Sequence, residues 1–374
     1  MHEHPSQSAP AKPPIRVPTW PLVAKNWAAK HVGYGTLEKL EAFTIDAPQS
    51  GRIDSIRVAA GEQLDFGAAV LSLDQQQPGQ ALADAERVWQ HALQRYRQAA
   101  SNFDRRPQGA AAMSQGGPES IVASQVGAAL AQQLAQSRSA LARADAQRQR
   151  ALLAVMQTDL ATPLTAMVRA VPVQAGAAVQ AGQPLLQLQP LAAIAARVTL
   201  PAVPPAPGAG ERDAYWPGQS CRLKTAALRG RLFSATLLRL VPAVQAASGA
   251  NSGANSAATN SALIVLDNPQ QLLKPGMPVR VQCEGLWREQ ALVVPRKALL
   301  ASQAASGLRN VYVLAEGRVH ERQPVFGQGD SRDVPVLAGL QQGEQLVIGK
   351  QHMLEPGVAA QVLKWVQVSV KDEF

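Results

Sequence analysis

The sequence predicts a mainly β, elongated, multidomain protein that carries a long antiparallel α-helical coiled-coil hairpin. Three observations support this fold class. A segment of short β-branched runs and glycines occurs twice, at residues 47–73 and again at 162–188. The residues between the two copies show the heptad spacing of paired helices. After the second copy, short apolar runs separated by Pro and Gly are typical of all-β domains.

The two copies align at a constant offset of 115 residues. Each is expected to form strand, turn, strand, turn, strand, with glycine supplying the positive φ of the turns. So short a segment buries too little apolar surface to fold alone. We therefore predict that the copies close on each other as one small sandwich. The matched pairs are Pro48/Pro163, Ile53/Val168, Ile56/Val171, Val58/Val173, Gly61/Gly176, Leu64/Val179 and Gly67/Gly182.

The insert at 75–157 is expected to be the helical hairpin. Pro107 and the run from Gly116 to Pro118 interrupt it and predict its tip. A second arm of about 38 residues would be about 55 Å long at 1.5 Å per residue, too long to lie over the sandwich, so we expect it to project. The apolar seam is Leu82, Ala85, Trp89, Ala92, Tyr96, Ala99 and Phe103 in the first arm, then Leu130, Leu134, Ser137, Leu141, Ala144, Arg148, Ala151 and Val155.

The remaining chain divides into β domains and a tail. Residues 1–19 are rich in Pro, Ser and Ala and predict a disordered tail. Two Pro-Gly turns, each followed by a strand, predict a β-barrel at 191–290. Residues 20–41 and 291–374 are expected to pair as one β-domain built from both chain ends, and 42–74 with 158–190 form the sandwich.

The two cysteines leave two readings open. Cys221 and Cys283 both follow Pro-Gly turns, so their strands could be neighbours and the thiols could form a disulfide. The sequence favours the prediction of two buried thiols.

Composition excludes several functional classes. The net charge is +9 and the pI about 9.9, yet the basic residues are scattered and mostly Arg, so nucleic-acid binding is not expected. The same charge suits work near an anionic membrane surface. The sequence contains no apolar run of about 18 residues and no visible signal peptide. Either the protein is cytoplasmic or the first residues of a precursor are missing.

No catalytic motif is present, so we expect no enzyme, no cofactor and no metal site. The nearest carboxylate pairs, Asp84 with Glu86 and Glu316 with Glu321, fit a solvated helix and a turn rather than acid/base chemistry. The six histidines are dispersed. His2 and His4 flank Glu3 and could hold a metal weakly, but a flexible tail is the better reading.

The repeat resembles the biotinyl/lipoyl carrier domain, in which a Lys in the joining turn carries the cofactor. This sequence has no lysine between Lys39 and Lys224, so no biotin or lipoate can be attached there. The order of the segments resembles the periplasmic adaptor or membrane fusion protein family (HlyD/AcrA type) between about residues 15 and 363. The stretches that carry this resemblance are 32–38 (VGYGTLE), 47–53 (APQSGRI), 266–269 (LDNP), 273–279 (LKPGMPV), 294–299 (VPRKAL) and 339–347 (GLQQGEQLV).

The resemblance implies a function and a cellular location. It implies an adaptor subunit of a tripartite resistance-nodulation-division efflux system in the periplasm, associated with the inner membrane, exporting drugs or other small molecules. Partners would be an inner-membrane transporter, an outer-membrane channel and further copies in a ring, usually a hexamer. Residues 20–41 plus 291–374 would be the membrane-proximal β-domain. The alternatives are an ATP-driven exporter, a heavy-metal pump, and a structural β protein unrelated to transport.

The resemblance also places the channel contact at the hairpin tip. The family pattern there is an Arg, a Leu and a Ser at set spacing. Here Arg106 and Ser120 fill the outer roles, the middle place falls near Met113, and the spacing departs from the pattern. The other reading is that these residues only cap and end helices. The expected partner-binding residues are Arg105, Arg106, Met113, Gly116, Gly117 and Ser120.

Overall fold

The computed structural model describes residues 14–105, 118–201, 215–228, 230–241, 259–300 and 309–363. The chain divides into two units. We call Ala28–Arg288 the central unit, and Met1–Trp27 together with Glu289–Phe374 the terminal unit. The central unit contains both sequence repeats, two helices and a barrel, and the terminal unit is built from both chain ends.

The two repeats interlock in the central unit. One sheet has the strand order β10-β5-β7-β8 and the other β4-β11-β9-β6, so each sheet combines strands of both copies. The first copy with the residues before it provides β4 (Phe43–Asp46), β5 (Gly51–Ile56), β6 (Gln63–Leu64) and β7 (Ala69–Leu73). The second provides β8 (Asp159–Ala161), β9 (Ala166–Ala170), β10 (Ala178–Val179) and β11 (Pro184–Pro190).

The backbone contacts between the copies follow a twofold pattern. The amide of Gly61 donates to the Val168 carbonyl at 2.8 Å, and the equivalent amide of Gly176 donates to the Ile53 carbonyl at 2.8 Å. The four turn glycines of the repeats have φ between 81° and 87°, which favours glycine. Apolar side chains from both copies fill the space between the sheets, among them Ile53, Val70, Leu71, Leu73, Leu164, Val168, Leu185, Leu186 and Leu188.

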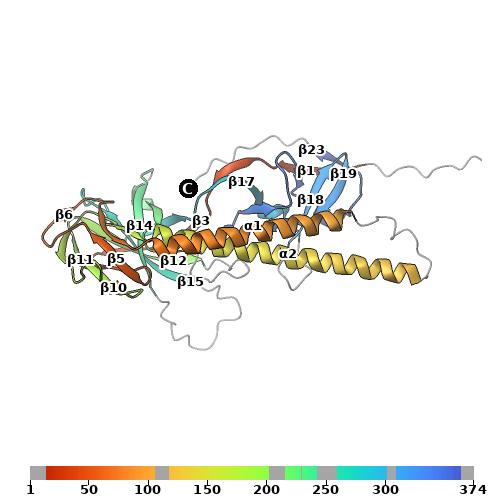
Figure 1. Ribbon diagram of the computed structural model, residues 1–374. Coiled ribbons are helices and arrows are strands. Elements are labelled where there is room, and N and C mark those ends of the chain that lie inside the picture. Colours follow the sequence, from red (N-terminus) through yellow and green to blue (C-terminus); the bar gives the residue numbers. More distant parts are fainter. Residues whose placement is uncertain are drawn as a thin grey trace, which may run out of the picture. The chain divides into compact units, whose positions relative to one another are not determined.

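Two helices occupy the insert between the repeats and lie side by side (Figure 1). They are α1 (Gln76–Asp104) and α2 (Pro118–Met156). Pro118 suits the first position of a helix because its φ is already helical and its missing N–H would have no partner there. No helix in the described part of the chain combines the length and apolar character needed to cross a bilayer.

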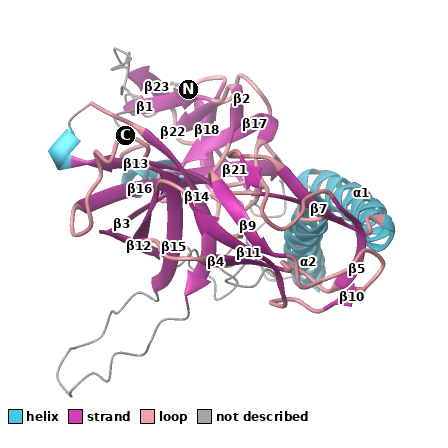
Figure 2. Cartoon of the chain, turned by 90° about the vertical axis from the view of Figure 1, so that its left-hand side faces the viewer, coloured by secondary structure: helices cyan, strands magenta, loops and turns pink. Residues whose placement is uncertain are grey.

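A closed six-stranded barrel completes the central unit, as predicted (Figure 2). Its strand order is β12-β15-β14-β13-β16-β3. The strands are β3 (Lys30–Lys39), β12 (Ala193–Pro201), β13 (Ser220–Thr225), β14 (Phe233–Val241), β15 (Thr259–Asp267) and β16 (Pro278–Glu284), with a 3-10 turn at Ala226–Leu228.

The prediction that residues 20–41 all belong to the terminal β-domain is wrong. Strand β3 closes the barrel between β12 and β16. Its glycines permit a very close approach of β12. A β-carbon on Gly33 would lie 2.6 Å from the Thr199 carbonyl oxygen, and one on Gly35 would overlap the Arg197 carbonyl. The two strands can lie this close only because positions 33 and 35 of β3 are glycines, which have no side chain.

The barrel is joined to the repeats by shared packing and by one carboxylate. Asp267, at the end of β15, accepts hydrogen bonds from the Thr165 amide at 3.0 Å and hydroxyl at 3.2 Å. The next residue, Asn268, accepts from the Leu273 amide and donates to the Leu273 carbonyl. The LDNP stretch therefore ends a barrel strand, anchors it to the second repeat and shapes the following turn.

The terminal unit contains two sheets, ordered β19-β18-β22-β1-β23 and β2-β17-β21-β20. The first includes β1 (Ile15–Pro21), β18 (Val311–Ala315), β19 (Arg318–Arg322), β22 (Gln345–Val347) and β23 (Ala360–Leu363). The second includes β2 (Ala24–Trp27), β17 (Arg288–Pro295), β20 (Val325–Phe326) and β21 (Asp333–Ala338). Short 3-10 turns lie at Arg296–Ala298 and Gln351–Met353.

The predicted disordered tail at 1–19 is wrong for its last residues. Strand β1 starts at Ile15 and pairs with β22 and β23. Val17 is completely buried in a cluster with Val319 and Val347, so its burial stabilises the ordered strand. Residues 1–13 lie outside the described part of the chain.

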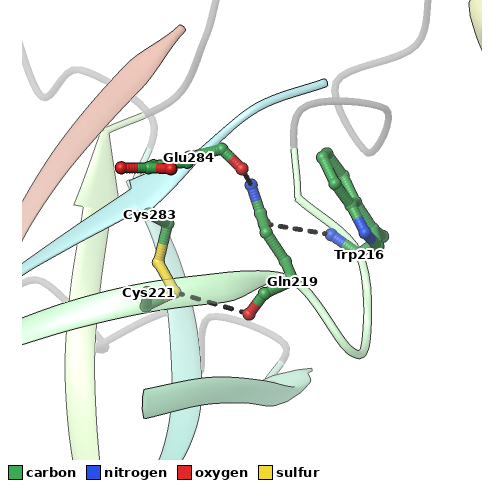
Figure 3. The surroundings of a disulfide bond; sticks show 5 residues. All are labelled: Trp216, Gln219, Cys221, Cys283 and Glu284. Carbon is green, nitrogen blue, oxygen red and sulfur yellow. Dashed lines mark hydrogen bonds between the residues drawn. A yellow bond between two sulfur atoms is a disulfide. The ribbon is translucent and has the colours of Figure 1, made fainter. Parts of the chain in front are cut away.

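Cys221 and Cys283 form a disulfide, so the favoured prediction of two free thiols is wrong. They lie directly opposite each other on β13 and β16, with their Cα atoms 4.1 Å apart. The buried side chain of Gln219 braces the same end of the barrel (Figure 3). It donates to the Glu284 carbonyl at 2.9 Å and accepts from the Trp216 amide at 3.4 Å.

Replacing Gly35 by Ala should disrupt barrel closure because the new methyl group meets the β12 backbone, which cannot move aside. We expect Gly35→Ala to lower the unfolding free energy by about 3 kcal/mol or more. Gly51→Ala is the control, since nothing lies within 4 Å of its added carbon. Urea denaturation followed by circular dichroism compares the two, and equal midpoints would contradict the assigned packing.

Removing the disulfide should destabilise the barrel. It closes a loop of 62 residues, and Cys221→Ala with Cys283→Ala should lower the unfolding free energy by about 2–4 kcal/mol. The measurement is the denaturation midpoint with and without dithiothreitol. The reductant should lower the midpoint of the native protein and leave that of the double variant unchanged. An identical midpoint for all four samples would show that the bond contributes nothing.

Candidate partner-binding helices

The two helices lie side by side (Figure 1), and several residues of the predicted seam are buried. On α1 the buried residues are Ala92, Tyr96 and Ala99. On α2, Leu134 and Leu141 are buried. Both helices are rich in Ala, Gln, Arg and Leu, which are strong helix formers, and the apolar positions recur every three or four residues.

The seam also contains a charged side chain. The Arg148 guanidinium lies over the Trp89 ring, 4.6 Å from its centroid, and 3.7 Å from the Glu86 carboxylate of α1. Arg148 also lies 3.5 Å from Asp145 on its own helix. Its aliphatic stem and planar head therefore replace an apolar residue at this heptad position, and a cation–π contact of this kind contributes about 0.5–2 kcal/mol.

A second ionic contact joins α2 to Arg288, the last residue of the central unit. Asp145 has a side chain only 3% exposed, and Arg288 Nη2 lies 2.7 Å from its Oδ2. Arg288 Nη1 lies 3.4 Å from Oδ1, so both carboxylate oxygens are engaged. With its amide oriented toward the guanidinium, Gln149 accepts from Arg288 Nε at 3.2 Å. These groups form one polar cluster around the buried Asp145 carboxylate.

The sequence reasoning missed Asp145 and Arg288. A signal for Asp145 was available, because it lies beside the predicted seam in a second stripe. The stripe is Ala142, Asp145, Ala146, Gln149 and Leu153, in which Asp145 is the only charged residue. A carboxylate at a position that the stripe buries indicates an ion pair. Arg288 carries no local signal, since its partner lies 143 residues away.

The predicted tip residues are mostly beyond the reach of the structure. Arg105 follows the last residue of α1, is exposed, and donates its amide to the Ser101 carbonyl at 3.1 Å. Arg106, Met113, Gly116 and Gly117 lie outside the described residues. Ser120 belongs to the start of α2, and its side chain is not described. Whether these residues lie together is therefore not tested within the described residues, and their role stays a prediction.

The helices also expose large apolar side chains. Val88 on α1 is 52% exposed, and on α2 Val126 and Met156 are 53% and 56% exposed. Such residues provide contact surface for another helix. Within the described ranges, no group of three or more His, Cys, Asp or Glu residues could hold a metal ion.

Comparison with protein families identifies two of the domains. Residues 290–352 match the C-terminal permuted SH3 domain of RND membrane fusion proteins. Residues 211–286 match the CusB-like β-barrel domain. The barrel match covers β13 to β16. The match to the permuted SH3 domain covers most of the terminal unit's C-terminal segment.

Individual relatives match over shorter stretches. The chain is 27% identical to the macrolide export protein MacA of Yersinia pestis over 134 residues, which cover 36% of this chain and 34% of MacA. It is 33% identical to the efflux pump periplasmic linker BepF of Brucella suis biovar 1 (strain 1330) over 93 residues, covering 24% of this chain and 21% of BepF. The matched part thus spans about a third or less of these relatives.

Among solved structures, MacA from Actinobacillus actinomycetemcomitans is 19% identical, with a TM-score of 0.37, over 88% of this chain and 99% of that one. The two domain matches and the sequence relatives agree with one another. The barrel and the C-terminal domain of this chain are therefore both similar to domains of membrane fusion proteins.

Proposed function

We propose that the chain is a non-enzymatic periplasmic adaptor of a tripartite efflux system, bridging an inner-membrane transporter to an outer-membrane channel for small-molecule export. One observation carries this proposal. A membrane-fusion barrel and C-terminal domain occur in the same chain as a pair of long helices inserted between two interlocked repeats. The interlocked repeats, 42–74 with 158–190, would be the biotinyl/lipoyl-like domain that bears the helices.

The helix pair is long enough to present its far end to a partner protein. With 39 residues, α2 is about 58 Å long at 1.5 Å per residue. Its C-terminal end leads into β8 of the sandwich and α1 packs along part of its length, so a coiled-coil hairpin would present a helical tip. The exposed Val88, Val126 and Met156 are suited to packing against helices of a channel protein or of neighbouring copies in a hexameric ring.

The disulfide supports the proposed compartment. Structural disulfides form and persist in oxidising surroundings such as the bacterial periplasm, and are rare in the cytosol. The Cys221–Cys283 bond is buried, since both residues are at most 1% exposed. A periplasmic protein associated with the inner membrane would acquire this bond during export. The absence of a visible signal in the sequence does not oppose this location.

The relatives favour a small organic cargo. MacA is named a macrolide export protein and BepF an efflux pump periplasmic linker. We infer drug or general small-molecule export for this chain, with a proton-driven transporter of the resistance-nodulation-division class as partner. An ATP-driven transporter is the alternative, and purification of the chain from cross-linked membranes would identify which one it binds.

A charged side chain at the tip should block channel docking. We expect Gly116→Glu to reduce export to the level of a strain lacking the protein, because a carboxylate would be buried without a partner in the docked interface. The measurement is drug susceptibility of a deletion strain complemented with each variant. Melting of the purified variant, followed by circular dichroism, should match the native chain.

The matched control is Gln132→Glu, which adds the same charge at an exposed position on α2. It should retain export. If Gly116→Glu exports as well as the control, the tip is not the channel contact. If the whole chain can be deleted without changing susceptibility to any tested compound, the adaptor function itself is wrong.

A further inference from the structure

Helix α2 is buried on more than the side that faces α1. Between Leu141 and Ala146, five of the six residues are buried and only Arg143 is exposed. A helix packed against one neighbour buries a stripe rather than nearly every position. Asp145 lies in this stretch and contacts Arg288, so part of the additional burial comes from the chain at the start of β17.

This additional contact depends on an ion pair. Both Asp145 oxygens face Arg288, at 2.7 and 3.4 Å, and Arg148 lies 3.5 Å from the same carboxylate. The Asp145 and Arg288 side chains are 3% and 14% exposed. Removing a carboxylate and a guanidinium from water is costly, and the cost is recovered only while they remain together. Loss of either partner therefore leaves a buried charge that favours separation.

The surroundings of the pair make separation inexpensive. Three of the four nearest buried residues on α2 are Ala142, Ala144 and Ala146, which expose little apolar area when a contact opens, and the fourth, Leu141, belongs to the predicted seam. On separation Asp145 and Arg288 both regain hydration. The barrel and the repeats, by contrast, are held by Leu, Ile and Val. Small and ionic groups are typical of contacts that form and break, and buried ion pairs are best attested as switch or register devices.

We propose that Asp145 and Arg288 form a reversible latch, which holds the helix pair in a docked position and releases it when the ion pair opens. Arg288 is the first residue of β17 and the last residue of the central unit, so the ion pair lies within that unit. Just before it, the Gly285 amide donates to the Ala29 carbonyl at 2.7 Å and anchors the end of the barrel.

The latch can be tested on the purified full chain, without any assumption about transport. Spin labels at Gln136→Cys on α2 and Thr199→Cys on β12 report the distance between helix and barrel, and both positions are exposed. The native cysteines are bonded to each other and do not react. The native protein should give mainly one distance. Arg288→Gln and Asp145→Asn should each raise the ratio of released to docked molecules about tenfold or more.

The control is Arg87→Gln, which removes an ion pair with Asp84 on the exposed face of α1. It should leave the distance distribution unchanged. The latch is rejected if Arg288→Gln and Asp145→Asn keep the native distribution. It is also rejected if either variant loses cooperative melting by circular dichroism, because the pair would then be part of the fold rather than a separable contact.

Discussion

Each sequence repeat lacks the backbone partners that the other supplies. Arg52 of the first copy pairs with Ala178 of the second, and Gln63 of the first copy pairs with Met167 of the second. Arg52 and Met167 are equivalent positions of the two copies, and so are Gln63 and Ala178. The second pairing therefore repeats the first with the copies exchanged. A strand with open amide and carbonyl groups is costly to bury, so neither copy is stable alone. This reciprocal pairing determines where the insert must begin and end, because β7 and β8, which flank it, are hydrogen-bonded neighbours.

The same constraint extends to the barrel. Ala195, Leu263 and Val265 lie on barrel strands but belong to the apolar core of the repeats. The hydrogen bonds from Thr165 to Asp267 fix the direction in which β15 leaves this core. The repeats and the barrel therefore share one packed interior, and a change in one would be felt in the other. In a close-packed interior such coupling is expected, since few voids can absorb a displacement.

Local and periodic features were predictable from the sequence. The repeats, the two helices and the closed barrel follow from glycine positions, heptad spacing and Pro-Gly turns. Strands β1 and β3 were misassigned because their partners lie hundreds of residues away or across a domain boundary, as with Val17 beside Val347. The two cysteines could not be paired without knowing that β13 and β16 are neighbours. Of the predicted tip residues the structure describes little, so that part of the site rests on resemblance.

The ends of the helices limit how they can move. At the base, the Gln76 amide donates to Asp74 at 2.8 Å, and Gln75 donates to Asp159 at 3.1 Å, both at exposed positions. Gln49 holds the last turn of α2 by donating to the Ala154 carbonyl at 2.9 Å. Exposed hydrogen bonds exchange readily with water, whereas β7 itself is buried over four of its five residues. A helix pair freed from Arg288 would therefore turn about the short links next to these strands, and the interlocked repeats would remain intact.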